Sequence, residues 1–304
     1  MNPSMAANST FRLFSSSDDN PPSDFCFGDS PKTPLPPLPP CVEVLSSEVS
    51  TTVNYAVEPV NFGDLTLLKG RVSTQEVFAL SNFDLVPGRY EGGLKIWEGS
   101  IDLVKALQSE IQCGHISFTG MRVLELGCGH GLPGIFACLK GAVTIHFQDF
   151  NAEVLKSLTI PNINSNLKNF QDSHANKKDM DIRFFAGDWA KMHEILPHVW
   201  DSKGELNCSD EYESNTTGYD VILMAETVYS IPTLQYLYEL IKKCLVPSRG
   251  VVYMAAKKHY FGVGGGTRRF LSVVEKDDCM VASLVAEIAD GSSNVREVWK
   301  LSFK

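Results

Sequence analysis

The period of the apolar positions changes several times between residues 121 and 256. Continuous apolar runs at 121–126, 143–148, 182–186, 219–225 and 250–256 predict buried strands. Apolar residues recur at helical spacing in the segments between them, which predicts helices at 132–140, 151–168, 190–197 and 232–245. Strands that are apolar on both faces and joined by helices are typical of a mostly parallel sheet with helices on each side. The sequence therefore predicts a doubly wound α/β fold.

Further elements flank this alternation. A helix is predicted within 94–107, with Ser100 as its N-terminal cap. After a helix that starts near Thr267, apolar stretches at 280–287 and 295–303 predict two adjacent strands that form a closing antiparallel hairpin. Together with the strands of the central segment they predict a Rossmann-like, seven-stranded sheet.

Residues 1–56 differ in composition from the rest of the chain. Eight of the sixteen prolines lie between Pro21 and Pro40, and serine and asparagine are frequent around them. Such a segment cannot bury enough apolar surface to fold, so we expect a disordered Pro/Ser-rich tail and a folded domain at 57–304. The stretch at 34–40 has the pattern of a ligand for a proline-binding domain, but a solvated linker is the more common role of such segments.

The strand predicted at 121–126 runs directly into a glycine-rich turn. Gly127, Gly129 and Gly131 lack side chains, so the backbone can turn sharply there and approach a ligand closely. The helix that follows offers free amide groups at its start. This combination is typical of a nucleoside cofactor site. A turn that only connects a strand to a helix looks the same, and residues 129–134 also match the Gly-x-Gly-x-x-Gly motif of dinucleotide-binding enzymes.

Polar residues accompany this turn at the ends of the neighbouring strands. Asp149 follows the second strand, where a carboxylate accepts the ribose hydroxyls of either kind of cofactor. Glu125, just before the first glycine, can hold the cationic amino group of an aminoacyl sulfonium, which favours S-adenosyl-L-methionine over a nicotinamide dinucleotide. After the third strand, the Asp188 carboxylate can accept an adenine amino hydrogen, and the Trp189 indole either stacks on a base or packs in the core.

The fourth strand leads straight into Glu226 and Tyr229. A carboxylate at the end of an apolar strand is costly unless it is solvated or used. The segment 257–266 follows the fifth strand and ends in a glycine-rich run, so we expect a loop that shapes a substrate channel. We interpret His130 and His259 as structural histidines.

In these residues the sequence resembles the histidine protein methyltransferases, a branch of the seven-β-strand methyltransferases. The resemblance covers about residues 90–303 and rests on Leu-Lys-Ile-Trp-Glu-Gly-Ser at 94–100, Phe-Gln-Asp-Phe-Asn at 147–151, Ile-Pro-Asn-Ile at 160–163, Gly-Asp-Trp at 187–189, Glu-Thr-Val-Tyr at 226–229 and Lys-Lys-His-Tyr-Phe-Gly-Val-Gly-Gly-Gly at 257–266. It implies that residues 57–304 are an S-adenosyl-L-methionine-dependent methyltransferase domain. It also implies a protein substrate, because the family methylates the tau nitrogen of a histidine in a large-subunit ribosomal protein.

The candidate cofactor-binding residues come partly from the motifs and partly from this resemblance. They are Ile96, Trp97, Glu98, Gly99, Ser100, Glu125, Gly127, Gly129, Gly131, Gln148, Asp149, Phe150, Gly187, Asp188, Trp189 and Ala225. Ala225 departs from the family pattern, in which a serine is common, so only a backbone contact would persist there.

Glu226 and Tyr229 are the candidate catalytic residues. Because a sulfonium methyl group is already electrophilic, the enzyme mainly has to align an imidazole lone pair with the breaking carbon–sulfur bond. We expect Glu226 to accept the other ring N–H, to present the tau nitrogen and to stabilise the cation that forms, while Tyr229 orients the ring.

Composition bears on partners and location. The net charge is −9 and the isoelectric point is near 5.3, so we expect no direct contact with nucleic acid. No apolar run approaches the ~18–20 residues of a membrane-spanning helix, so we expect no membrane contact. The eight cysteines form no Cys-x-x-Cys pair, which argues against a metal site and for a reducing compartment. We expect a monomer in the cytoplasm, or in the nucleus as well.

Three other functions use the same residues: a protein-lysine methyltransferase of the same fold, a nicotinamide-dependent oxidoreductase, and a non-catalytic protein that kept the cofactor fold. Trp97 and the pair of Glu226 and Tyr229 count against the oxidoreductase, because hydride transfer does not require them. The sequence leaves the other two open.

Overall fold

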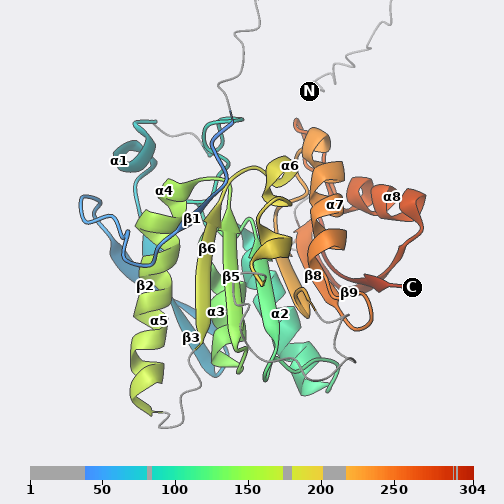
Figure 1. The fold of residues 1–304 in the computed structure, drawn as a ribbon, viewed down its shortest axis with the longest axis horizontal. Coiled ribbons are helices and arrows are strands. Elements are labelled where there is room, and N and C mark those ends of the chain that lie inside the picture. The colour runs from blue at the N-terminus through green and yellow to red at the C-terminus, as the bar shows by residue number, and fades with distance from the viewer. Residues whose placement is uncertain (1–37, 81–83, 174–179, 201–216, 290, 292–293) are drawn as a thin grey trace, which may run out of the picture. The chain divides into compact units, whose positions relative to one another are not determined.

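The structure is a computed structural model that describes residues 38–80, 84–173, 180–200, 217–289, 291 and 294–304 (Figure 1). Residues 1–37 of the tail predicted at 1–56 therefore lie outside the described residues. Within the described part, eight strands form one sheet: β1 (Val42–Val44), β4 (Arg122–Leu126), β5 (Thr144–Asp149), β6 (Asp181–Ala186), β7 (Val221–Ala225), β8 (Val251–Lys257), β9 (Met280–Ile288) and β10 (Arg296–Phe303). The strands β2 (Ala56–Phe62) and β3 (Leu65–Arg71) pair with each other as a hairpin.

The order of the large sheet is β1-β6-β5-β4-β7-β8-β10-β9. The strands from β6 to β8 pair in parallel, and β10 lies antiparallel between β8 and β9. The predicted doubly wound fold with a closing antiparallel hairpin is thus confirmed. The strand order reverses at β4, which lies between β5 and β7, and a ligand crevice is expected beyond the carboxyl ends of the strands at such a point.

The helical segments connect these strands. They are α1 (Thr74–Phe78), α2 (Glu98–Gln112), α3 (Leu132–Leu139), α4 (Ala152–Val154), the π-helical turn η1 (Leu155–Thr159), α5 (Ile160–Ser173), α6 (Trp189–Met192), the 3₁₀ turns η2 (Leu196–His198) and η4 (Ile231–Thr233), α7 (Leu234–Cys244) and α8 (Thr267–Asp277). No helix in the described ranges has the length and the apolar character that crossing a membrane requires.

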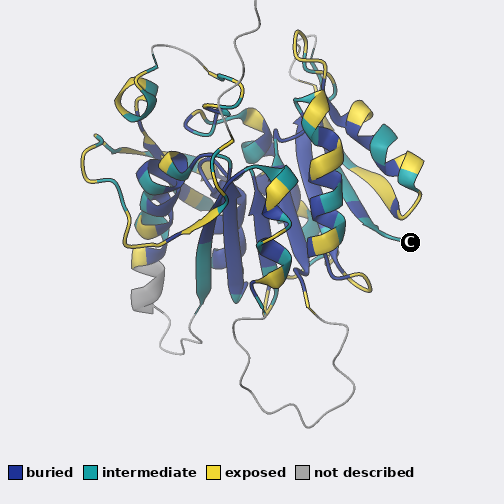
Figure 2. Ribbon diagram, turned by 45° about the horizontal axis from the view of Figure 1, so that its top comes forward, coloured by how far each residue is buried: buried dark blue, intermediate teal, exposed yellow. Residues whose placement is uncertain are grey.

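Alternate residues of each parallel strand face opposite layers of helices. Val123 of β4 lies in the apolar cluster that includes residues of α2, α3 and α5. Its neighbour Leu124 lies in the cluster that includes residues of α6, α7 and α8. Figure 2 shows the result, with buried strands in the middle and helices that expose only their outer faces. Burial on both faces explains why the strands read as continuous apolar runs.

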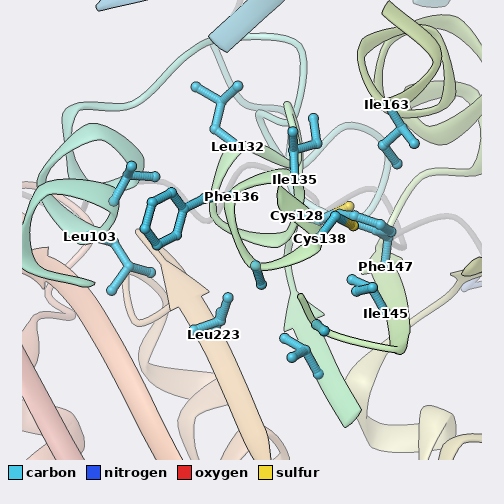
Figure 3. Packing of buried hydrophobic residues seen from close by; sticks show 14 of the residues in the cluster. Leu103, Cys128, Leu132, Ile135, Phe136, Cys138, Ile145, Phe147, Ile163 and Leu223 are labelled. Carbon is cyan, nitrogen blue, oxygen red and sulfur yellow. The ribbon is translucent and has the colours of Figure 1, made fainter. Parts of the chain in front are cut away.

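Phe136 of α3 anchors the first of these clusters. Its side chain is fully buried, and its ring meets Phe118 edge to face with centroids 6.1 Å apart. Figure 3 shows Phe136 beside Leu103 of α2, with Leu223 of β7 in the same cluster. Helix α3 is therefore fixed to the sheet directly behind the glycine-rich turn that precedes it.

The sheet has eight strands rather than the predicted seven, because it begins earlier in the sequence than residue 57. Strand β1 lies within the segment assigned to the tail, and it pairs antiparallel with β6 through Val42 opposite Ala186. Val44 is buried, and Arg183 of β6 forms an ion pair with Glu43 at 2.6 Å. A strand of three residues is too short for its alternation to stand out beside a proline-rich stretch.

The start of α2 also differs from the prediction. Trp97, not Ser100, occupies the N-cap position, and it forms no side-chain capping bond. Ser100 lies in the first turn and donates its hydroxyl to the Trp97 carbonyl at 2.8 Å. The helix therefore needs a partner from elsewhere in the fold for its first amide groups.

Replacing Phe136 with alanine should lower the free energy of unfolding by about 3–5 kcal/mol, because the cavity left in the core cannot fully collapse. Urea denaturation followed by circular dichroism measures the loss. Phe261, whose side chain is 72% exposed, provides the matched control, and Phe261→Ala should change the same quantity by less than about 0.5 kcal/mol. Equal losses for the two variants would contradict the role given to Phe136.

Candidate active site

A cavity of about 1040 Å³, counted with the space that opens to solvent, lies at the carboxyl ends of the parallel strands. Its size is ample for a nucleoside cofactor. The structure brings twelve of the predicted site residues to its wall: Trp97, Ser100, Gly127, Gly129, Asp149, Phe150, Gly187, Asp188, Trp189, Ala225, Glu226 and Tyr229. Their contact with a cofactor stays a prediction.

The glycine-rich turn adopts the backbone conformation that the sequence suggested. Gly127, Gly129 and Gly131 have φ angles of 60°, 46° and 70°, in the left-handed region that disfavours residues with a side chain. The Gly129 amide donates to the Asp149 carboxylate at 2.9 Å. A Cβ atom on Gly129 would lie 2.9 Å from the Gly93 carbonyl oxygen, so the turn is also packed against the segment before α2.

Asp149 is buried at the end of β5. One carboxylate oxygen accepts the Gly129 amide and the other accepts the Asn151 amide at 3.0 Å. Burial raises the pKa of this carboxyl to about 6, against the effect of the backbone amides of Asn151, Gly129 and Phe150. The group is thus mostly ionised at neutral pH, and each oxygen keeps a lone pair for a further donor.

Gln148 and Trp189 brace the loops around the cavity. The Gln148 side chain donates to the Gly187 carbonyl at 2.9 Å, and its oxygen accepts the Trp189 indole N–H at 2.8 Å and the Gly127 amide at 3.3 Å. Asp188 accepts the Ala190 amide at 2.7 Å and so caps α6. One buried amide therefore fixes the ends of β4 and β6 relative to β5.

Six predicted residues do not contribute to the cavity wall. They are Ile96, Glu98, Gly99, Glu125, Gly131 and Gln148. The placement of Glu125 at the mouth of the site is wrong. Its side chain is 1% exposed, and its carboxylate accepts the Gly134 amide at 2.7 Å, inside the first turn of α3. Burial raises the pKa of Glu125 well above its usual value. Glu125 faces α3 because its neighbours Leu124 and Leu126 point to the other side of the sheet.

Glu226 occupies a special position directly after β7. It is 7% exposed, and its φ of 57° lies in the left-handed region, which is rare for a residue with a side chain. One carboxylate oxygen accepts the Gly99 amide at 3.1 Å, and the other accepts the Tyr260 hydroxyl. Glu226 therefore supplies the cap that α2 lacks locally. A Cβ atom on Gly99 would lie 2.7 Å from a Glu226 carboxylate oxygen, so a side chain here would displace the carboxylate from this position.

The segment 91–97 covers the cavity and was only partly predicted. Tyr229 donates its hydroxyl to the Glu91 carboxylate, and the Trp97 indole donates to the Gly92 carbonyl at 3.0 Å. Burial and the nearby Glu91 raise the pKa of Tyr229. The Lys95 ammonium lies 4.6 Å from the centre of the Trp97 ring. Gly92 and Gly93 have the local sequence of a simple turn, and nothing in it shows that Gly93 packs against the glycine-rich turn at Gly129.

Two buried polar atoms at residues of the cavity wall have no hydrogen-bond partner within the described chain. They are the Thr227 hydroxyl and Nδ1 of His130. Nε2 of His130 lies 3.2 Å from the Leu94 carbonyl, so Nε2 carries the proton and Nδ1 is an acceptor. Burial lowers the pKa of His130 to about 4, which keeps the ring neutral at pH 7. Unpaired buried atoms of this kind fit a wall that binds a polar ligand.

The buried ring of His130 should make folding sensitive to acid. Its folded-state pKa of about 4 lies below the ordinary value of 6.5, so its stability contribution is fully present above pH 6.5 and is lost as the pH falls through about 4. In His130→Gln, the loss of unfolding free energy between about pH 7 and about pH 4.5 should be smaller by roughly 2–3 kcal/mol. Urea denaturation at both pH values measures it. Parallel pH dependences of the two proteins would contradict this.

Comparisons with known proteins indicate the family of the chain. A family profile described as lysine methyltransferase matches residues 88–277. The histidine protein methyltransferase 1 homolog of Dictyostelium discoideum is 39% identical over 225 residues, which are 74% of this chain and 62% of that protein. The homolog of Bos taurus is 34% identical over 273 residues, which are 82% of this chain and 67% of that protein.

The EEF1A lysine methyltransferase 3 of Mus musculus is 26% identical over 165 residues, which are 54% of this chain and 55% of that protein. The chain thus spans about two thirds or less of the length of these curated relatives. The family profile described as lysine methyltransferase matches more than half of the chain, so the chain belongs to that family. Its identity with the relatives from Dictyostelium discoideum and Bos taurus shows that, within this family, it belongs with the histidine protein methyltransferase 1 homologs.

Proposed function

We propose that this protein transfers a methyl group from S-adenosyl-L-methionine to the tau nitrogen of a histidine in a protein substrate, a large-subunit ribosomal protein. The observation that carries the proposal is the Glu226 carboxylate, buried at the wall of a cavity that the glycine-rich turn also lines. The family of the chain supports methyl transfer, and the resemblance of its motifs supports histidine and the ribosomal substrate.

The residues of the cavity fit this cofactor. The Asp149 carboxylate keeps lone pairs for ribose hydroxyls, and the Asp188 carboxylate lies at the wall for an adenine amino group. The unpaired atoms of Thr227 and His130 offer a hydroxyl and an acceptor for the remaining polar groups. When bound, S-adenosyl-L-methionine supplies a sulfonium methyl group that is ready for transfer to a nucleophile.

The residues of the chain have to present a neutral imidazole. An unprotonated histidine carries the lone pair on one nitrogen and a hydrogen on the other. Both Glu226 oxygens already accept one donor, from Gly99 and from Tyr260, which leaves a lone pair on each for the ring N–H of the substrate. As the tau nitrogen forms its bond to the methyl carbon, the ring becomes cationic, and the nearby carboxylate stabilises that charge.

A lysine substrate is the second candidate, because the family profile carries that description. A lysine ammonium has to lose a proton before it can attack, since its ordinary pKa is about 10.4. A histidine ring needs no such step at neutral pH. Burial raises the pKa of Glu226, but a carboxylate remains a far weaker base than a lysine amine, so it is poorly suited to deprotonate an ammonium group, which favours histidine.

S-adenosylhomocysteine should stabilise the protein against heat and NAD should not. At a concentration of 100 times its Kd, a ligand that binds only the folded state adds about 2.7 kcal/mol. Asp149→Ala should remove most of the shift in the melting temperature, whereas the exposed Asp64→Ala should keep it. Thermal-shift assays with both ligands measure the melting temperature. An increase with NAD alone would favour a nicotinamide-dependent oxidoreductase over a methyltransferase.

Glu226→Gln should lower the rate of labelled methyl transfer into a ribosomal protein fraction by roughly 10–100-fold, because the uncharged amide no longer stabilises the cation. Its affinity for S-adenosylhomocysteine should stay within about twofold. Glu239→Gln, in α7, is the matched control and should keep full turnover, because the Glu239 side chain is 44% exposed and does not line the cavity.

Mass spectrometry of the labelled substrate then locates the mark. A methyl group on the tau nitrogen of histidine is the expected result. A mark on lysine would replace histidine as the target, and a Glu226→Gln variant with full turnover would remove the role given to Glu226.

A further inference from the structure

The loop between β8 and α8 is fastened to the loop that follows β7. The Gly265 amide donates to the Tyr229 carbonyl at 3.0 Å, and the Gly266 amide donates to the Val228 carbonyl at 2.8 Å. Ser230 and Gly264 form a further antiparallel bridge. The glycine-rich run therefore holds the backbone on which Glu226 and Tyr229 lie.

Glycine is required at these positions for close packing. A Cβ atom on Gly265 would collide with the carbonyl oxygens of Val228 and Tyr229, and one on Gly266 would collide with the Lys258 carbonyl. The run was expected to shape a substrate channel. Its Val263 does line the cavity, and its glycines pack against the loop that carries the candidate catalytic residues.

Tyr260 is the side chain that this loop delivers to the site. Its backbone is fixed on both sides, since its amide donates to the Gly265 carbonyl at 3.1 Å and its carbonyl accepts the Gly264 amide at 2.8 Å. Its hydroxyl accepts the Lys257 amide at 3.4 Å and donates its own hydrogen to Glu226. The Tyr229 ring lies edge to face with it, with centroids 6.4 Å apart. A hydroxyl that accepts one bond and donates another has a fixed direction for its hydrogen.

We propose that Tyr260 is a positioning residue, which turns the Glu226 carboxylate toward the target imidazole and keeps it ionised there. The inference rests on the function proposed for Glu226. Together, the Gly99 amide and the Tyr260 hydroxyl occupy one lone pair on each oxygen, so the carboxylate cannot rotate freely and the remaining lone pairs have fixed directions. Neither the sequence motifs nor the family resemblance assigned a role to Tyr260 itself.

The charged and titratable groups around Glu226 explain why the hydroxyl matters. Burial raises the pKa of Glu226, and the nearby Glu98 of α2 acts in the same direction. The Tyr260 hydrogen bond, Lys257 at the end of β8 and the Gly99 amide act against it. Tyr229 faces the same region and is itself bonded to Glu91. Removing the Tyr260 hydroxyl therefore raises the pKa of Glu226 further, and a smaller fraction of the carboxylate is ionised at a given pH.

The test is the pH profile of kcat for labelled methyl transfer, measured from about pH 5.5 to about pH 9. Tyr260→Phe should lower kcat at neutral pH by about tenfold, and the loss should shrink as the pH rises. The acid limb of the profile, where kcat falls as the pH decreases, should lie at higher pH in Tyr260→Phe than in the wild type, because the pKa of Glu226 is higher in the variant. The titration of the substrate histidine is common to both proteins, so the difference between the limbs reports on the enzyme.

Tyr238→Phe is the matched control, because its hydroxyl also donates to a carboxylate, that of Asp277 at 2.9 Å, but away from the cavity. It should leave kcat and the acid limb unchanged. Calorimetric binding of S-adenosylhomocysteine should stay within about twofold for both variants. A Tyr260→Phe variant with a wild-type acid limb and wild-type kcat would overturn the proposal, and so would a loss of S-adenosylhomocysteine affinity with no change in the pH profile.

A second measurement uses 3-fluorotyrosine at position 260, which keeps the ring and the hydroxyl and makes the hydroxyl a stronger donor. The acid limb should then move to lower pH, opposite to the shift in Tyr260→Phe. An unmoved limb would count against Tyr260. If Glu226→Gln retains full turnover, the role proposed for Glu226 fails and this inference fails with it. If Glu226→Gln is impaired and neither Tyr260 variant moves the limb, only this inference fails.

Discussion

The hydrogen bond from the Gly129 amide to the Asp149 carboxylate ties the first glycine turn of the sheet to the end of the neighbouring strand. Parallel pairing places Leu126 opposite Gln148, so the turn after β4 and the acid after β5 reach the same edge. Gly129 presents its amide to the carboxylate with φ in the left-handed region, which favours glycine. Because Gly129 has no side chain, the Gly93 carbonyl can pack closely against the turn. This contact holds the segment before α2 at the cavity wall.

Buried carboxylates perform a second structural task at this edge. Neither α2 nor α3 has a local side-chain cap, and each receives a carboxylate from the end of a strand. Glu125 accepts the Gly134 amide of α3, and Glu226 accepts the Gly99 amide of α2. Amides at the start of a helix are unpaired and favour negative charge, so both contacts offset the cost of burying an acid. Only Glu226 also faces the cavity, and it is the one that Tyr260 holds from the other side.

The chemistry of the site follows from how these donors are shared. Methyl transfer to an imidazole mainly requires that the ring lone pair is aligned with the breaking carbon–sulfur bond. A carboxylate whose lone pairs have fixed directions can hold the ring in that alignment. The residues that fix it come from the start of α2, the end of β7 and the loop after β8, which are far apart in the sequence. Their convergence depends on the order of the parallel strands, which sets β7 between β4 and β8.

The sequence by itself determined the layered fold and the positions of the strand ends, because strands buried on both faces leave continuous apolar runs and their turns need glycine. The strand predicted at 182–186, for example, is β6 at Asp181–Ala186. Local patterns could not reveal β1, which is stabilised by its pairing with β6, or the cap of α2, which comes from a residue 127 positions away. Tertiary structure alone decided that Glu125 is covered by α3 while Glu226 lines the cavity, and that Tyr260 meets Glu226. The two acids look alike in the sequence, since each follows apolar strand residues, and only the packing of neighbouring elements distinguishes a buried cap from a group that a substrate can reach.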